Sequence, residues 1–338
     1  MELALAPGLI LVVGANGAGK TNLLESLHVG TQGFSPRTRM DAQLVRHGAE
    51  RARVSVAGRR GAIPTVVDVK LGRRDPKQVD LNGSRLRSVE LLRREIATLV
   101  FTPDRLALVK AAPAVRRAYL DRALARLLPG RADVPVEYLT ALGQRNAALR
   151  RVAAGLADAS AIEPWTAQVV ARGESLVAAR HETIDLLAPG FAGISGELGL
   201  AGGELEYVGE PPSQALFDSR LARDLERGTT GVGPHLDDVA IRAVDRDLRT
   251  FGSQGEQRVA VLALLLSEAE ALRDRRGVAP LVLLDDVLSE LDGTRRANLA
   301  DHLAQLGQAV VTATGPEALP LEPRQLLEVT PGRVRAAA

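Results

Sequence analysis

The feature that most constrains the fold of this chain is a glycine-rich segment near its start, GANGAGKT, from Gly14 to Thr21. An apolar run, Leu9 to Val13, precedes it, and a segment of helical character, Asn22 to Val29, follows it. A strand, a glycine loop ending in Lys-Thr and a helix together form a cradle for phosphate, because backbone N–H groups and a helix N-terminus favour an anion. The sequence therefore predicts an α/β domain that binds a nucleotide.

Each residue type in this phosphate loop (Gly14–Thr21) has a physical reason. Gly14, Gly17 and Gly19 leave room for close backbone approach. Lys20 brings a charge to the β- and γ-phosphates, and the Thr21 hydroxyl can reach Mg²⁺. We therefore expect ATP and Mg²⁺ as cofactors; a glycine-rich turn without nucleotide is the alternative. The other expected nucleotide contacts are Ala15, Asn16, Ala18 and Asn22.

A second apolar run, Leu281 to Leu284, ends in two carboxylates, Asp285 and Asp286. A continuous apolar run is typical of a strand covered on both faces. Because neighbours on a strand point in opposite directions, the two aspartates can have different roles. We expect Asp285 to hold Mg²⁺ opposite Thr21, and Asp286 to orient or deprotonate the attacking water as the catalytic residue beside Lys20. Helix N-capping is the alternative for this pair.

Between these two pieces lies the signature segment FGSQGEQR, Phe251 to Arg258, directly before an apolar helix. Ser253 and Glu256 have the spacing of a capping box, so helix capping alone could explain the segment. Glycines on both sides of a hydroxyl at a helix N-terminus also favour an anion. The residues by themselves leave both interpretations open.

The order of elements predicts one α/β sheet completed by both ends of the chain, with a mostly helical domain inserted. The expected divisions are a phosphate-loop lobe over 1–110, a helical arm over 111–195 and a C-terminal part over 196–338. Asn82-Gly83 predicts a tight hairpin turn, apolar residues at helical spacing predict a helix after Pro113, and Pro164 fits the first turn of another helix.

Composition narrows the chemistry. The 338 residues include no cysteine, which excludes disulfides, thiol catalysis and cysteine-ligated zinc. No apolar run is long enough to span a membrane, and the run before the phosphate loop is a buried strand rather than a signal peptide, so we expect a cytoplasmic protein. From Arg37 to Arg94 there are fifteen Lys or Arg against six Asp or Glu. This basic lobe suits double-stranded DNA, although a solvated face would look the same.

Three segments together, GANGAGKTN, SQGEQR and LVLLDDVLSELD, resemble the motif series of ABC-type ATPase heads in SMC-like DNA-repair proteins. Within that class the chain resembles the RecF family of recombination mediators, through FTPDRLALVKAAPAVRRAYLD, QRNAALR, GPHLDD and DDVLSELDGTRR. These segments extend over most of the chain from about residue 9 to 315. The resemblance implies an ABC-type ATPase head and a weak, DNA-dependent ATPase used as a conformational switch.

The resemblance also implies a site shared by two copies, in which the signature segment of one caps the γ-phosphate held by the phosphate loop of the other. The residues implied there are Ser253, Gly255, Gln257 and Asp292. Thr312 or Thr314 stands where many ABC proteins have a γ-phosphate-sensing histidine. The absence of that histidine is in keeping with slow hydrolysis. Leu236 stands where the family typically has arginine.

The partners that the resemblance implies are a second copy, in an ATP-dependent homodimer, and double-stranded DNA near junctions with single strands. RecR, together with RecO, is the implied protein partner in loading RecA. The alternatives are the ATP-binding subunit of an ABC transporter or another SMC-like ATPase head. Transporter subunits typically carry LSGGQ and a smaller helical insert, which SQGEQR and the long helical region disfavour.

Overall fold

The structure is a computed structural model of the chain and describes residues 1–337. It divides into two compact units. The sheet unit comprises Met1–Leu106, Gly193–Leu200 and the chain from Val261 to the C-terminal end, and the arm unit comprises Ala107–Ala192 and Ala201–Ala260.

The elements of the sheet unit are β1 (Leu9–Val13), α1 (Lys20–Gln32), β2 (Arg51–Arg60), β3 (Ile63–Gly72), β4 (Gln78–Leu81), β5 (Ser84–Arg85), α2 (Val89–Glu95), β6 (Thr98–Phe101), β10 (Leu281–Leu284), α10 (Gly293–Leu306), β11 (Ala309–Ala313), β12 (Gln325–Thr330) and β13 (Arg333–Ala336). Those of the arm unit are α3 (Ala107–Lys110), α4 (Pro113–Leu127), α5 (Val134–Ala153), β7 (Gly203–Val208), α7 (Gln214–Arg227), β8 (Asp238–Ala243), β9 (Arg246–Asp247) and α8 (Leu248–Phe251). Two long helices, α6 (Glu163–Glu197) and α9 (Gln254–Arg276), contribute residues to both units. Short 3-10 turns lie at Asp41–Leu44, Pro103–Leu106, Pro129–Arg131, Ala159–Ile162, Leu288–Glu290 and Pro316–Ala318.

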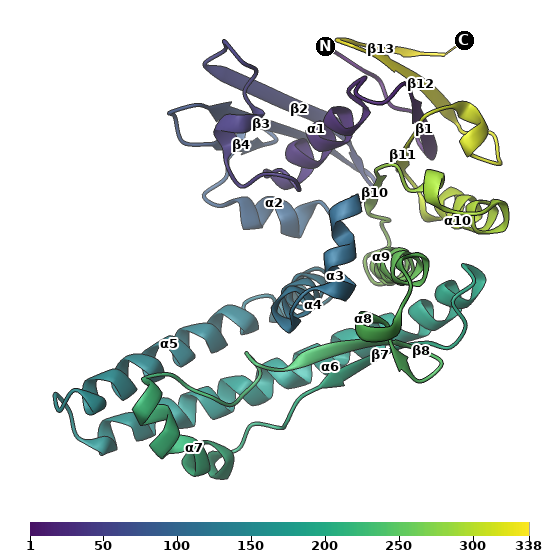
Figure 1. The fold of residues 1–338 in the computed structure, drawn as a ribbon. Helices are drawn as coiled ribbons and strands as arrows, with labels where there is room; N and C mark the ends of the chain where they lie inside the picture. Colours follow the sequence, from purple (N-terminus) through teal and green to yellow (C-terminus); the bar gives the residue numbers. More distant parts are fainter. Residues whose placement is uncertain (338) are drawn as a thin grey trace. The chain divides into compact units, whose positions relative to one another are not determined.

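The core of the sheet unit is a six-stranded sheet in the order β13-β12-β1-β11-β10-β6 (Figure 1). All its neighbouring pairs are parallel except β12 with β13. The first strand of the chain lies between β11 and β12, strands from the last thirty or so residues. The predicted α/β sheet, completed by both ends of the chain, is confirmed.

Helix α1 packs on this sheet and also on a second, antiparallel sheet of the order β2-β3-β4-β5. Leu23 and Leu24 of α1 share a buried cluster with Ile10 of β1. A β-carbon on Gly30 would lie only 2.3 Å from a methyl group of Val56, so glycine permits the close approach of α1 to β2. The phosphate loop, which leads into α1, is therefore fixed on a rigid base.

Two local predictions are confirmed. Asn82 and Gly83, between β4 and β5, have φ values of +50° and +80°, which is the left-handed pair of a primed hairpin turn. Helix α4 begins at Pro113, where the missing N–H leaves no intrahelical bond unmade.

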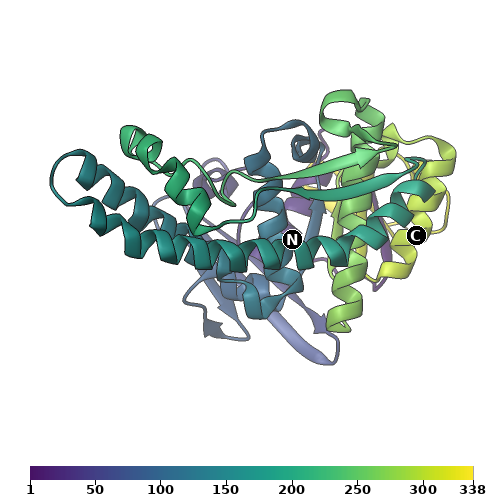
Figure 2. The ribbon, with the colours of Figure 1, turned by 90° about the horizontal axis from the view of Figure 1, so that it is seen from below.

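The arm unit is built on α5 and α6, which lie side by side in Figures 1 and 2. Tyr138 of α5, Val169 of α6 and Phe217 of α7 share one buried cluster. The unit also contains an antiparallel sheet of β7, β8 and β9, so it takes in more of the chain than the expected 111–195. The physical reason is a bidentate ion pair from Arg116 of α4 to Asp238 of β8, with both N–O distances at 2.7 Å. None of the described helices is both long and apolar enough to cross a membrane.

Candidate nucleotide site

The phosphate loop joins the buried end of β1 to the first turn of α1. At Gly14 a β-carbon would lie 2.4 Å from the carbonyl oxygen of Val329, so no side chain fits there. Gly17 and Gly19 have φ values of +79° and +110°, which favour glycine. Gly19 is the N-cap of α1 and supplies no side-chain hydrogen bond, so the first N–H groups of the helix remain for an anion.

Lys20 lies across this loop. Its ammonium group donates to the carbonyl oxygens of Gly14 and Ala15, at 2.7 and 3.1 Å. The side chain is largely buried, so its charge is confined to the concave side of the loop. Of the other expected contacts, Ala15, Asn16 and Asn22 are exposed, while Ala18 is buried in the core beneath the loop; these positions line the loop through their backbone.

Asp285 and Thr21 meet although 264 residues separate them. The Thr21 hydroxyl lies 2.9 and 3.1 Å from the two carboxylate oxygens of Asp285. Strand β10 ends at Leu284, and the Asp285 N–H donates to the Phe101 carbonyl of β6, which fixes the carboxylate at this edge. Thr21 and Asp285 thus join the end of the loop that carries Lys20 to the end of β10.

The two adjacent aspartates differ sharply in environment. Asp285 is buried, whereas Asp286 is exposed and has a left-handed φ of +49°. The sequence predicted opposite directions from strand alternation, but the strand ends before both residues, and the left-handed turn produces the difference. Asp286 is therefore free to reach solvent beside the loop, as a residue that positions water must be.

A divalent cation is implied by this type of site, and the residues present fit one. Thr21 and Asp285 offer a hydroxyl and a carboxylate, the hard oxygen ligands that Mg²⁺ prefers. Asp285 accepts hydrogen bonds from neutral hydroxyl groups and forms no ion pair with any residue from 1 to 337. A buried carboxylate without an ion-pair partner favours a cation, here between these two residues.

The signature segment begins α9 with a complete capping box. The Ser253 N–H donates to the Glu256 carboxylate at 2.7 Å, and the Glu256 N–H donates to the Ser253 hydroxyl at 3.2 Å. These bonds hold the pKa of Glu256 below its usual value, the backbone bond from Ser253 being the main cause. Gly255 is exposed beside them. The capping interpretation is correct, and it leaves the Ser253 hydroxyl proton available to a ligand.

Gln257, which the resemblance implies as a nucleotide contact, packs inside the arm unit in this structure. Its side chain is buried, and its amide donates to the Leu248 carbonyl at 2.8 Å. A β-carbon on Gly252 would lie 2.6 Å from the same carbonyl, so α8 and the start of α9 pack closely. Gln257 therefore holds the signature segment in shape, and Phe251, exposed by 66%, is the residue this segment presents to solvent.

Three remaining positions have clear structural places. Asp292 is the N-cap of α10, where its carboxylate accepts from the Arg295 N–H at 3.0 Å, and it is mostly exposed. Thr314 is exposed just after β11. Thr312 is wholly buried in β11, and both its hydrogen-bonding capacities are used inside the protein. The Thr312 hydroxyl therefore has no proton left to donate to a phosphate. The sequence alone did not reveal these hydrogen bonds.

The predicted basic lobe is partly neutralised. Four exposed cations of the second sheet form ion pairs, namely Arg51 with Asp75, Arg53 with Asp68, Lys70 with Asp80 and Arg85 with Asp80. The Arg53 hydrogen bond is the main cause of a lowered pKa at Asp68. By contrast, Arg46, Arg73 and Arg74 are exposed and have no carboxylate partner among the described residues. The Arg73 guanidinium donates to the carbonyls of Arg46 and Ala49, so the first two arginines adjoin.

The GPHLDD segment of the arm unit is structural. His235 lies between the Tyr138 hydroxyl at 2.7 Å and the Thr230 carbonyl at 3.1 Å. Because the carbonyl can only accept, Nε2 carries the proton and Nδ1 accepts from Tyr138. Asp237 accepts from the Tyr207 hydroxyl at 2.6 Å. Leu236 is exposed by 54%, so the position of the usual arginine faces solvent.

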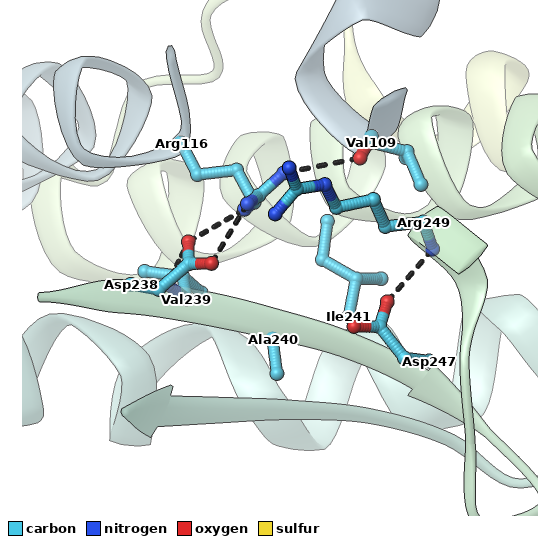
Figure 3. A pocket seen from close by; sticks show the side chains of 8 residues that line it. All are labelled: Val109, Arg116, Asp238, Val239, Ala240, Ile241, Asp247 and Arg249. Atoms are coloured by element: carbon cyan, nitrogen blue, oxygen red, sulfur yellow. Dashed lines mark hydrogen bonds and ion pairs between the residues drawn. The ribbon is translucent and has the colours of Figure 1, made fainter. Parts of the chain in front are cut away.

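A small pocket of the arm unit adjoins this segment (Figure 3). Its wall includes Arg116, whose guanidinium is occupied by Asp238 and by the carbonyls of Val109 and Ala111. Arg249 lines the pocket from α8. Because the charge of Arg116 is already paired, we assign the nucleotide site to the phosphate loop rather than to this pocket.

Comparison with solved structures supports the fold. The chain has a TM-score of 0.83 and 26% identity to a structure described as the recombination mediator protein RecF with ATP in the RecFOR pathway, over 99% of this chain and 93% of that one. A Pyrococcus furiosus Smc head domain matches with a TM-score of 0.57 at 17% identity, over 98% of this chain and 90% of that one. The second likeness concerns the fold alone.

Sequence comparison gives the family. Residues 1–333 match the family described as RecF/RecN/SMC N terminal domain. A DNA replication and repair protein RecF of Anaeromyxobacter dehalogenans is 40% identical, over 93% of this chain and 88% of its own length. The corresponding protein of Heliobacterium modesticaldum is 35% identical with the same coverage. The chain therefore belongs to the RecF/RecN/SMC N-terminal domain family, and within it to the RecF proteins of DNA replication and repair.

Proposed function

We propose that this protein is an ATP-switched DNA-binding protein of recombinational repair and replication restart. The observation that carries the proposal is the group of Lys20, Thr21 and Asp285, which joins a phosphate loop to a metal-binding carboxylate from the far end of the chain. The RecF relatives, one of them described with ATP, support the same nucleotide. Lys20 would neutralise phosphate charge, and Thr21 with Asp285 would hold Mg²⁺, which polarises the γ-phosphate when bound.

Hydrolysis is assigned to Asp286 as the group that orients or deprotonates water. Its exposure, and the absence of an ion pair between it and any residue from 1 to 337, support this role. The reaction is proposed to be slow and to reset a conformational state rather than to drive chemistry. Thr312, at the position where many related ATPases place histidine, has no hydrogen-bonding capacity left for the γ-phosphate, which favours a low rate.

The switch is proposed to be a homodimer that holds two ATP molecules. The signature segment of one copy would cap the phosphate loop of the other, through Ser253 and Gly255. Two features support this arrangement: Ser253 has a hydroxyl proton to donate, and Phe251 beside it is exposed although it is aromatic and apolar. Asp292, exposed at the start of α10, would lie at the same interface.

Duplex DNA is the proposed macromolecular ligand, at junctions between double and single strands. The contact we favour is the set of Arg46, Arg73 and Arg74, because these exposed arginines have no carboxylate partner among the described residues and the Arg73 guanidinium lies against the backbone of Arg46. Paired cations such as Arg53 would contribute less, since a phosphate must compete with Asp68. RecO and RecR are proposed as protein partners in loading RecA, which places the protein in the cytoplasm.

The decisive experiment measures duplex binding and oligomeric state with and without ATP. Wild-type protein should dimerise and bind a gapped duplex more tightly with ATP. Lys20→Ala should remove the ATP dependence of both, while Lys70→Ala, an exposed lysine paired with Asp80, should leave it intact. Unchanged affinity of Lys20→Ala for a fluorescent ATP analogue would refute the assigned phosphate site.

The shared site and the DNA contact are tested separately. Ser253→Arg should retain ATP binding as a monomer and fail to dimerise, whereas Ser219→Arg on the exposed face of α7 should dimerise normally. Arg46→Ala with Arg74→Ala should reduce the slope of log affinity against log salt by roughly 2, since each phosphate contact contributes about 0.9. Arg53→Ala should change this slope less; an equal change would exclude the unpaired cluster as the main contact.

A further inference from the structure

One buried hydroxyl links the two aspartates of the site. Thr312 lies in β11, between the strand that leads into the phosphate loop and β10, which ends directly before Asp285. It is the single polar residue of the buried run AVVTA, and it is 0% exposed. A buried hydroxyl without partners costs free energy, so its bonds indicate what it does.

Thr312 makes two bonds, both to the end of β10. Its Oγ1 donates to Oδ1 of Asp285 at 2.8 Å and accepts the N–H of Asp286 at 2.9 Å. A hydroxyl has one proton to donate, and here it is donated to a carboxylate in a hydrogen bond. The same oxygen therefore fixes the carboxylate of Asp285 and the backbone of Asp286.

The bond to Asp286 acts on a strained residue. Its φ of +49° lies in the left-handed region, which residues with a side chain rarely adopt. Such a conformation persists only where surrounding contacts hold it. The Asp286 N–H is tied to Thr312, so this bond helps determine the direction in which the Asp286 carboxylate projects.

The bond to Asp285 acts on a group that has a second, exchangeable partner. Thr21 approaches the same carboxylate from α1, and Mg²⁺ bound there would replace that hydrogen bond with coordination. The Thr312 bond comes from the opposite element and does not compete with a ligand. A hydrogen-bond partner that is not itself a metal ligand can orient a metal-binding carboxylate in this way.

We propose that Thr312 is a positioning residue that sets the carboxylate of Asp285 and the turn at Asp286 through one hydroxyl. The relevance of this role to nucleotide binding rests on the proposed ATP function. The two hydrogen bonds of Thr312 do not depend on that function. Threonine suits the position because its branched side chain has few rotamers in a strand, and its methyl group packs in the buried sheet while the hydroxyl stays directed at β10.

The test compares Thr312→Val, which keeps the shape and removes the hydroxyl, with Thr312→Ser, which keeps the hydroxyl. Thr140→Val, exposed on α5, is the matched control. For Thr312→Val we expect the Mg²⁺ concentration that half-saturates ATP binding to rise about tenfold or more, with ATP binding in EDTA unchanged. Thr312→Ser should stay within about threefold of wild type on the same scale.

A second readout needs no nucleotide. Within residues 1–337 the Asp286 N–H donates to Thr312 alone, so hydrogen exchange in a peptide spanning Asp285 to Glu290 should accelerate in Thr312→Val and not in Thr140→Val. Circular dichroism verifies that each variant is folded, and if Thr312→Val is not, Thr312→Ser and Thr312→Ala carry the comparison.

The outcomes separate the two claims. If Thr312→Val matches wild type in both Mg²⁺ dependence and exchange, the positioning role is wrong. If Thr312→Ser is as impaired as Thr312→Val, packing rather than the hydroxyl matters, and the role is again wrong. If wild-type protein binds no ATP, the proposed function fails, while the exchange measurement still decides the role of Thr312.

Discussion

Buried carboxylates occur in both units of this protein, and their partners differ in kind. In the arm unit, Asp224 is paired with the fully buried Arg145 at 2.8 Å, and the same guanidinium group donates to Thr230. In the sheet unit, Asp285 receives hydrogen bonds from the hydroxyls of Thr21 and Thr312. Asp224 has an arginine as its ion-pair partner, whereas Asp285 has no ion-pair partner among residues 1–337.

This difference separates a structural carboxylate from a functional one. A buried charge that meets its counter-charge on folding needs nothing further. A buried charge that meets only dipoles remains attractive to a cation. By this criterion Asp224, which pairs with Arg145, is structural, and Asp285 is the carboxylate that we propose for Mg²⁺. The partly exposed Asp121 and Asp238 also pair with arginines of the arm, Arg180 and Arg116.

The largest expected effect concerns ligand binding. Asp285→Asn should weaken Mg²⁺-dependent ATP binding by about 100-fold or more, because it removes the charge that holds the metal. Asp224→Asn should leave this binding unchanged under conditions where the protein is folded. Titration of a fluorescent ATP analogue with Mg²⁺ or EDTA measures both. Equal losses in the two variants would break the distinction.

The next effect is on the free energy of unfolding, and its direction differs between the two units. Asp224→Asn should destabilise the protein by about 3–5 kcal/mol, because it leaves the Arg145 charge buried and unpaired. Asp285→Asn, measured without Mg²⁺, should cause no loss and could raise stability by about 1 kcal/mol. Urea unfolding followed by circular dichroism gives both values, with the exposed Asp218→Asn on α7 as the control. A large loss in Asp285→Asn would mean that this carboxylate is structural too.

A smaller effect depends on pH in the arm unit. Burial is the main cause of a pKa at His235 below its usual 6.5, so the folded state favours the neutral ring. The stability this provides is fully present above pH 6.5 and is lost as pH falls through the lowered value. Unfolding midpoints from pH 8 to roughly 5 should therefore fall more steeply for wild type than for His235→Gln. Parallel curves would show that His235 does not titrate on unfolding.

The smallest effect concerns the capping box of the signature segment. Because the pKa of Glu256 is lowered from 4.5, its contribution is present above pH 4.5 and is lost as pH falls through the lowered value. Glu256→Gln keeps an acceptor for the Ser253 N–H but removes the charge, so this acid dependence should become flatter. Comparing wild type and variant between pH 6 and roughly 3 by circular dichroism gives the difference. A wild-type curve as flat as that of the variant would contradict it.

The local devices of this protein could be predicted from sequence. The phosphate loop, the Ser253–Glu256 capping box and the Asn82-Gly83 turn each involve residues a few positions apart, so backbone preference and short-range hydrogen bonds decide them. The buried strand ending at Asp285 was predicted as well, since a continuous apolar run has few other places in a fold.

The tertiary structure decided which groups oppose which. Sequence gave no reason to join Thr312 to Asp285, to bury the Gln257 side chain, or to pair Arg53 with Asp68, because each partner comes from another element and only strand order and packing bring them together. The chain's own residues thus determined that a phosphate site would form. The folded sheet determined that its two aspartates differ, because a left-handed turn and one buried threonine hold them in different surroundings.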